Sequence, residues 1–351
     1  RFMKFIQKSK DLHSKYPNFL IALFFISGFI FDIATLGQID EFGNFLGHTL
    51  YILLLILSYT LIDWEFNNSW LKKISIYQVD IFHFLAGGLL SGFAIFFFKS
   101  SSLSSSGIFI ALILMILLAN ESPLFQKRGS ILKLTLVQFC ISSYFIIYIP
   151  VIIGMMGVVI FLLSIGLSSI LLPLVLKRLK HPATNEAKII SISIALLLSL
   201  GYFTNILPPV PLSVKEIGVY HKVVKLENSY NLYKEGSLTN FLGLSDTSFK
   251  AQPGDSVYIY ARVFAPKGLN ENLYIQWEKW DKVWRVSDRI PLSIQGGNTW
   301  GYRAYTYKKN YTEGLWRAKV MSSDNREIGR IDFSISNVLK EAREWTIEVK
   351  N

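Results

Sequence analysis

Cysteine is nearly absent from this chain: among 351 residues only Cys140 carries a thiol, and it stands inside an apolar block. A single cysteine allows no intrachain disulfide, so any domain outside a membrane must be stable without covalent cross-links. The redox compartment does not follow from so low a cysteine count. Histidine is scarce as well, and His221 alone lies in the C-terminal part, where histidine-rich metal chemistry is therefore not expected.

Charged residues are few. They form 17% of the chain, whereas soluble domains carry about 25%, and apolar residues form 51%. Apolar blocks fill residues 18–207 and then stop, and after Pro208 the chain reads like a soluble protein. A chain with this distribution needs a bilayer for its first part.

The net charge of +11 raises the question of a nucleic acid partner. Much of the basic excess lies in short loops between apolar blocks, where membrane topology is the simpler cause. No groove-reading motif is present. We therefore expect membrane lipids, and no nucleic acid, around this chain.

Seven apolar segments approach the length of about 20 residues that a helix needs to cross a bilayer. The fifth and sixth are separated only by Pro150 and together are too long for one crossing. The sequence thus predicts an α-helical transmembrane bundle of about seven spans. The predicted spans are residues 18–37, 46–63, 78–98, 107–120, 131–149, 151–176 and 187–207.

Loop charge predicts the orientation, because Lys and Arg stay on the cytoplasmic side. The N-terminal segment 1–17 and the second, fourth and sixth loops are basic, whereas the odd-numbered loops carry few or no cations. The N-terminus is therefore expected in the cytoplasm. Seven crossings then place the C-terminal part outside it.

Residues 214–351 read as short strands after a stiff Pro-rich linker at 208–213. In 257–263 apolar and polar residues alternate, as in a half-buried strand. Residues 225–250 are less regular and are interpreted as a long loop, with a short helix as an alternative. We expect an all-β sandwich, with an immunoglobulin-like arrangement as one candidate. The predicted strands are 214–223, 257–263, 272–278, 283–294, 299–307, 315–321, 327–335 and 344–349.

The C-terminal motifs carry a family resemblance. They are WRVSDRIPLSI at 284–294, Gly301-Tyr302-Arg303, GLWRAKV at 314–320 and IGRIDF at 328–333. Residues 210–336 resemble the C-terminal β-rich domain of unknown function found in bacterial polytopic membrane proteins, and Asn120-Glu121-Ser122-Pro123 resembles their membrane half. The resemblance implies a protein of the bacterial envelope, placed in the inner (cytoplasmic) membrane, and no particular activity.

Ionisable residues inside membrane spans are costly and are functional candidates by default. Five polar residues are predicted to share the cytoplasmic leaflet: Asp63, Asp80, His83, Asn120 and Glu121. They could form a site for a proton, a metal ion or a lipid headgroup. The interpretation we favour is interfacial, in which these residues reach headgroups, water or nearby lysines. No metalloprotease or rhomboid-like motif accompanies them, and no cofactor is identified.

Two further candidates lie toward the outer side. Asp32 and His48 could pair near the outer ends of the first two helices, more simply as a structural pair than as a proton-linked switch. Trp280 stands in a polar turn, where it could anchor a partner or pack locally. Four other tryptophans are expected in the core: Trp277, Trp284, Trp300 and Trp316.

These observations favour a non-enzymatic envelope membrane protein whose outer β-sandwich docks a protein or glycan partner. One alternative is a membrane enzyme or an ion or lipid transporter that works at the inner-leaflet cluster. Another is a sensor that couples ligand binding outside to the helices. The sequence does not decide among them, because fold alone does not imply function.

Overall fold

The computed structural model of the chain describes residues 17–62, 77–127, 129–227, 229–235, 247–295, 301–338 and 343–350. Side chains within these ranges are described except at 17–25, 270 and 293–295. The chain divides into two compact units. The first contains the described residues up to 96 together with 110–145 and 165–197, and the second contains 97–109, 146–164 and the described residues from 198 onwards.

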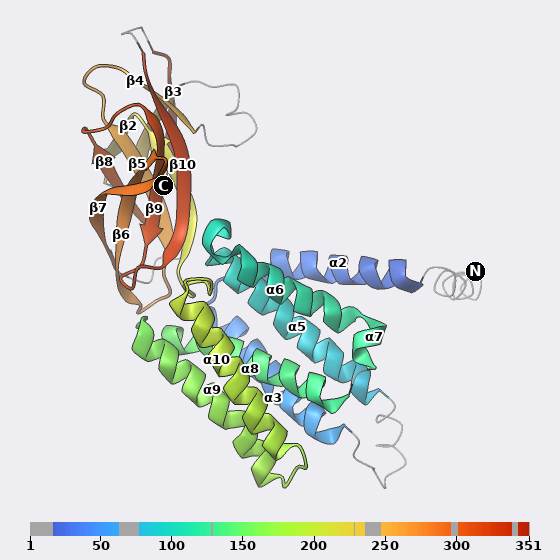
Figure 1. Ribbon diagram of the computed structural model, residues 1–351. Helices are drawn as coiled ribbons and strands as arrows, with labels where there is room; N and C mark the ends of the chain where they lie inside the picture. Colours follow the sequence, from blue (N-terminus) through green and yellow to red (C-terminus); the bar gives the residue numbers. More distant parts are fainter. Residues whose placement is uncertain are drawn as a thin grey trace, which may run out of the picture. The chain divides into compact units, whose positions relative to one another are not determined.

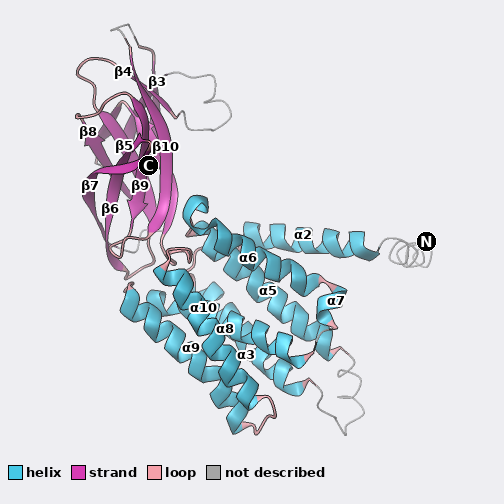
Figure 2. Cartoon of the chain, in the orientation of Figure 1, coloured by secondary structure: helices cyan, strands magenta, loops and turns pink. Residues whose placement is uncertain are grey.

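Helices come first along the described chain and strands follow (Figures 1 and 2). Six of the helices are long and apolar enough to cross a membrane: α3, α5, α6, α8, α9 and α10. The predicted span at 18–37, the first along the chain, would bring the number to seven. It stays a prediction, because the described side chains of α2 form only the shorter apolar segment Ile26–Thr35. The helices are α2 (Pro17–Thr35), α3 (Phe42–Leu61), α5 (Gln78–Lys99), α6 (Leu103–Glu121), α7 (Pro123–Gln126), α8 (Ser130–Ile153), α9 (Val158–Arg178) and α10 (Thr184–Phe203).

The predicted break between the fifth and sixth spans exists, but its position at Pro150 is wrong. Pro150 lies inside α8, which continues to Ile153. The chain turns where glycine supplies left-handed backbone, with φ of 74° at Gly154 and 111° at Gly157. Proline removes one helix hydrogen bond and can be accommodated in a long helix, whereas two residues with positive φ end it.

Hydrogen bonds between glutamine and serine residues connect helices of the first unit. The buried Gln138 of α8 donates from Nε2 to Ser142 Oγ (3.1 Å) and to the backbone oxygen of Ser168 in α9 (3.2 Å). Its Oε1 accepts a hydrogen bond of 2.8 Å from Ser191 Oγ in α10. Serine and glutamine side chains hydrogen-bond between membrane helices in this way and let the helices approach closely.

The strands of the second unit form three sheets. The strand orders are β1-β5-β8, β4-β10-β9-β6-β7 and β11-β3-β2, and β4 pairs with β10 in parallel. Most predicted strands are confirmed. The strands are β1 (Ser213–Tyr220), β2 (Lys222–Lys225), β3 (Tyr230–Glu235), β4 (Ser248–Ala251), β5 (Val257–Phe264), β6 (Asn270–Asp281), β7 (Val283–Gln295), β8 (Tyr302–Lys308), β9 (Gly314–Met321), β10 (Glu327–Asn337) and β11 (Trp345–Lys350).

The interpretation of 225–250 as a long loop is wrong at both ends, where β3 and β4 lie. In β3 the buried Tyr230 and Leu232 alternate with partly exposed neighbours, so the period-two signal is present but short. Strand β4 has only four residues, and its partner β10 comes much later in the chain, so local pattern alone does not reveal it. The alternative of a short helix within 225–250 stays a prediction, because residues 236–246 lie outside the described ranges.

One apolar core joins the first two sheets. Val257, Ile259 and Val263 of β5 belong to the same buried cluster as Ile275 of β6 and Phe333 of β10.

Trp277 (0% exposed) and Trp316 (3%) lie in this core, as predicted. The placement of Trp284 there is wrong. A bulge after Trp277 shifts the β6–β7 register, and Trp284 pairs with Trp280 and is only partly buried. Trp300 lies outside the described residues.

Candidate functional site

The predicted polar cluster is assembled in part around His83 in the first unit. His83 is 3% exposed, and its Nδ1 lies 2.8 Å from Asn120 Oδ1. The Asn120 amide nitrogen donates to the backbone oxygen of His83 (2.9 Å) and lies 3.4 Å from Glu121 Oε1. Because a carbonyl oxygen only accepts, the amide orientation is fixed and Nδ1 must be the donor to Oδ1. In the neutral ring, Nε2 then carries the lone pair.

The polar groups line a groove of about 760 Å³ between α2, α3, α5, α6 and α7, which we call the α5 groove. Gly87 and Gly88 lie along it, where a Cβ would come within 3.1 Å of Glu121 Oε1 and 3.0 Å of the Tyr51 ring respectively. Side chains larger than hydrogen would therefore narrow it. The α5 groove is lined by Ser27, Gly28, Phe29, Phe31, Asp32, Tyr51, Asp80, His83, Phe84, Gly87, Gly88, Ser91, Leu117, Glu121 and Gln126.

The remaining predicted site residues are distributed as follows. Asp80 lines the α5 groove from the first turn of α5, and Asp63 lies outside the described residues. Asp32 also lines the groove and accepts a hydrogen bond of 2.5 Å from Ser91 Oγ. His48 is buried against the rings of Phe93 and Phe96. A functional pairing of Asp32 with His48 stays a prediction.

Metal coordination is one of the chemistries that the sequence allows for this cluster. Within the described ranges, no group of three His, Cys, Asp or Glu side chains is placed to hold a metal ion. The groove residues supply hydrogen-bond acceptors at several separate points instead.

A second candidate lies on the five-stranded sheet, on the face that points away from the core. Trp280 pairs with Trp284 across the β6–β7 hairpin, and their ring centroids are 5.2 Å apart. Side chains two residues apart share a face of a strand, so the register places Val286, Leu315 and Arg317 on that same face. We call these five residues the tryptophan corner. Trp280 is 43% exposed, Val286 49% and Leu315 52%.

Arg317 fixes one side of the tryptophan corner. Its guanidinium lies 3.9 Å from the centroid of the Trp284 ring and makes two hydrogen bonds to Asp332, of 2.6 and 2.7 Å. The Arg317 hydrogen bond lowers the pKa of the Asp332 carboxyl and raises that of the Arg317 guanidinium. A stacked, doubly bonded arginine holds the indole in one orientation.

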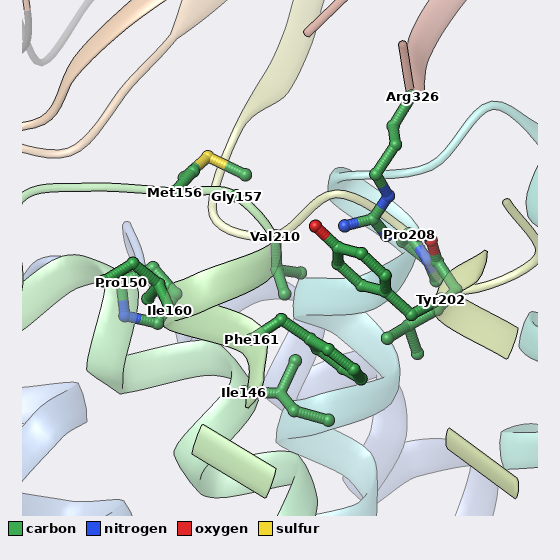
Figure 3. A pocket seen from close by; sticks show the side chains of 11 residues that line it. Ile146, Pro150, Met156, Gly157, Ile160, Phe161, Tyr202, Pro208, Val210 and Arg326 are labelled. Atoms are coloured by element: carbon green, nitrogen blue, oxygen red, sulfur yellow. Dashed lines mark hydrogen bonds between the residues drawn. The ribbon is translucent and has the colours of Figure 1, made fainter. Parts of the chain in front are cut away.

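The second unit also contains a joint between the end of α10 and the β9–β10 turn (Figure 3). Arg326, 5% exposed, stacks over the Tyr202 ring at 4.2 Å and donates to the backbone oxygen of Leu207. Tyr202 donates from its hydroxyl to Asp324 (2.8 Å) and stacks on Phe161 at 4.0 Å. The cavity beside Arg326 measures about 20 Å³, room for one water. This site, the Arg326 joint, is a structural connection and has no room for a ligand.

Sequence reasoning missed several of these residues. Ser91 carries no local signal of a polar role, although its hydroxyl donates to the Asp32 carboxylate. Arg326 and Tyr202 have no local signal, because their partners are far away in the chain. For Arg317 a signal existed: an arginine alternating with apolar core residues in a strand must point to the other face.

One family model matches a short part of the chain. Residues 270–335 match the family model described as "Protein of unknown function (DUF2914)". This segment runs from β6 into β10 and includes the whole tryptophan corner. It lies within the region 210–336 that resembles such a domain and confirms that part of the resemblance. Among curated proteins, none matches the chain.

Two solved structures show weak likeness. One is titled a crystal structure of beta-glucosidase from Listeria innocua, with 13% identity, 32% of this chain covered and a TM-score of 0.19; the chain spans 16% of that enzyme. The other is the Pseudomonas fluorescens alkylpurine DNA glycosylase AlkC bound to DNA containing an abasic site analog, with 9% identity over 75% of this chain and 72% of that one, and a TM-score of 0.19. Such scores carry no argument about fold or function.

Proposed function

We propose that this protein is a non-enzymatic, membrane-anchored docking protein of the bacterial envelope. In this account the apolar helices hold the β-rich region outside the cytoplasm, as the loop charges predict. The first two sheets, which share one core, form a β-sandwich. The tryptophan corner on the five-stranded sheet binds a protein partner.

The exposed tryptophan corner is the observation that carries the proposal. Trp280 remains 43% exposed although the same sheet buries Trp277 completely. Around it lie Leu315 and Val286, and the Arg317–Asp332 pair forms a charged border. Tryptophan and arginine dominate the energetics of protein interfaces, where an apolar centre is surrounded by a polar rim. The aliphatic neighbours favour a protein over a glycan, which would need several converging polar groups beside the ring.

The Arg326 joint supports the anchoring part of the proposal. It connects the last apolar helix to a strand turn through a stacked ring, a buried guanidinium and hydrogen bonds. This connection orders the β9–β10 turn within the second unit, and a preordered domain loses less entropy on binding.

Co-purification from native membranes tests the proposal. We expect a stoichiometric protein partner in mild detergent, and we expect Trp280→Ala and Leu315→Asp to remove it. Truncating a hot-spot tryptophan costs at least about 2 kcal/mol, roughly 30-fold in affinity.

Trp345→Ala is the matched control, because Trp345 is similarly exposed (45%) and lies on β11. A lone chain, or a partner retained equally by all three variants, would refute docking at the tryptophan corner. Release of the bound material by glycosidase would indicate a glycan instead.

The alternative functions concern the helices. Transport or catalysis at the His83 cluster, and sensing through the helices, stay predictions. They would depend on the Asn120 side chain, which lies within hydrogen-bond reach of both His83 and Glu121.

A further inference from the structure

The α5 groove is acidic, and its residues suit one kind of ligand. Three carboxyl groups line it, from Asp32, Asp80 and Glu121. No lysine or arginine is among the described residues that line it. Charge complementarity therefore favours a cation, because three carboxylates would repel an anion.

His83 provides an independent sign of a ligand. Its side chain is almost completely buried, yet Nε2 has no hydrogen-bond partner within the described part of the chain. Asn120 holds Nδ1 as the donor, so the neutral ring presents Nε2 as an acceptor. A buried acceptor without a hydrogen-bond donor costs folding free energy. Native structures therefore usually supply a donor to such an atom. A donor supplied by a ligand would complete it.

We propose that the α5 groove binds the protonated primary amine of an amphiphile, namely the headgroup of an aminophospholipid. A primary ammonium offers three N–H donors and one positive charge. Three of the residues that line the groove carry acceptors, namely Glu121, Asp80 and His83. A metal ion fits less well, since the described residues place no three ligands around one point.

The apolar wall of the groove suits the acyl chains of the proposed lipid. Phe31 (65% exposed) and Phe84 (69%) stand along it, and Gly87 and Gly88 leave its floor without side chains. From Asp80 to Ser91 the groove follows α5 for about 16 Å, at a rise of 1.5 Å per residue. An acyl chain can lie against this wall, whereas a free polyamine would gain nothing from it.

Native mass spectrometry of the full chain in mild detergent tests the proposal. The probes are phosphatidylethanolamine and phosphatidylcholine with identical acyl chains. Both carry a phosphate, but only the first has N–H donors. We expect retention of the ethanolamine lipid to exceed that of the choline lipid about tenfold, the value of one hydrogen bond to a charged group. A long-chain primary amine added as a competitor distinguishes recognition of the ammonium group from recognition of the whole lipid headgroup. If this amine binds, the ammonium group alone is sufficient for recognition.

Variants locate the site. Glu121→Gln and His83→Phe should each abolish the preference for the amine, whereas Glu186→Gln, an exposed carboxylate of α10 outside the groove, should preserve it. Equal retention of the two lipids by the unmodified protein, or an unchanged preference in both groove variants, would overturn the proposal. The lipid comparison on the unmodified protein stands even if a variant fails to fold. No partner protein enters this test, so its outcome is independent of the docking function.

Discussion

Arg326 is a buried cation in the second unit, 5% exposed. Burial lowers the pKa of its guanidinium below the usual range, although Asp324 and the Tyr202 ring favour the charged form. A buried cation persists only where its surroundings compensate the lost hydration. In the Arg326 joint the Tyr202 ring and the Leu207 carbonyl supply that compensation.

Replacing Arg326 by methionine should destabilise the second unit. The variant keeps the length of the side chain but leaves the Leu207 carbonyl without its donor and Asp324 without its nearby cation. We expect the free energy of unfolding to fall by about 2–4 kcal/mol. Denaturant titration followed by tryptophan fluorescence measures it. Arg285→Met is the control, since that side chain is 70% exposed and should change stability by less than about 0.5 kcal/mol. Equal effects of the two substitutions would contradict a structural role for the Arg326 joint.

The Arg317–Asp332 pair predicts a pH dependence. The Arg317 hydrogen bond lowers the pKa of the Asp332 carboxyl in the folded protein. The pair's contribution is therefore complete above the unfolded-state pKa of about 3.9 and disappears as the pH falls through the lower folded value. Asp332→Asn should reduce stability at pH 7 by less than about 1 kcal/mol, because the carboxylate is half exposed. The difference from the unmodified protein should vanish in acid. A difference that persists or grows in acid would exclude this linkage.

At the scale of elements, hydropathy alone predicts the ends of the six long helices to within about four residues, except the start of α9, which lies seven residues after the predicted start. The turn between α8 and α9 escaped it, because proline was taken as the breaker while glycine conformation sets the boundary. Alternation predicts most strands but not β3 and β4, and it does not reveal the bulge that places Trp284 on the face away from the core. The His83–Asn120 contact could be anticipated only as a shared membrane level, because helix pairing is a long-range property.

Gly154 should be the critical position of the α8–α9 turn. It has φ of 74°, and a Cβ there would lie 2.7 Å from the carbonyl oxygen of Gly268. Gly154→Ala combines backbone strain with a clash against the main chain, and we expect a loss of about 1–3 kcal/mol. Gly157→Ala is the comparison: its φ is also positive, but no atom lies within 4 Å of the added Cβ. Thermal unfolding of both variants measures the difference, and a larger loss for Gly157→Ala would contradict the clash.

At the scale of the whole molecule, the account depends on which side of the membrane each part occupies. The single native cysteine, Cys140, is buried, so thiols introduced elsewhere can be labelled selectively. We expect Lys282→Cys, in the β6–β7 hairpin, to react with a membrane-impermeant maleimide in intact cells. Asn185→Cys, at the start of α10, should react only after permeabilisation. The opposite pattern would reverse the predicted orientation.

The most direct test of the docking function places a photoreactive amino acid at position 280 in living cells. We expect one discrete protein adduct after illumination. The adduct should disappear in a Leu315→Asp background and should be absent when the probe stands at position 345. No adduct from position 280, or the same adducts from both positions, would contradict a binding role for the tryptophan corner.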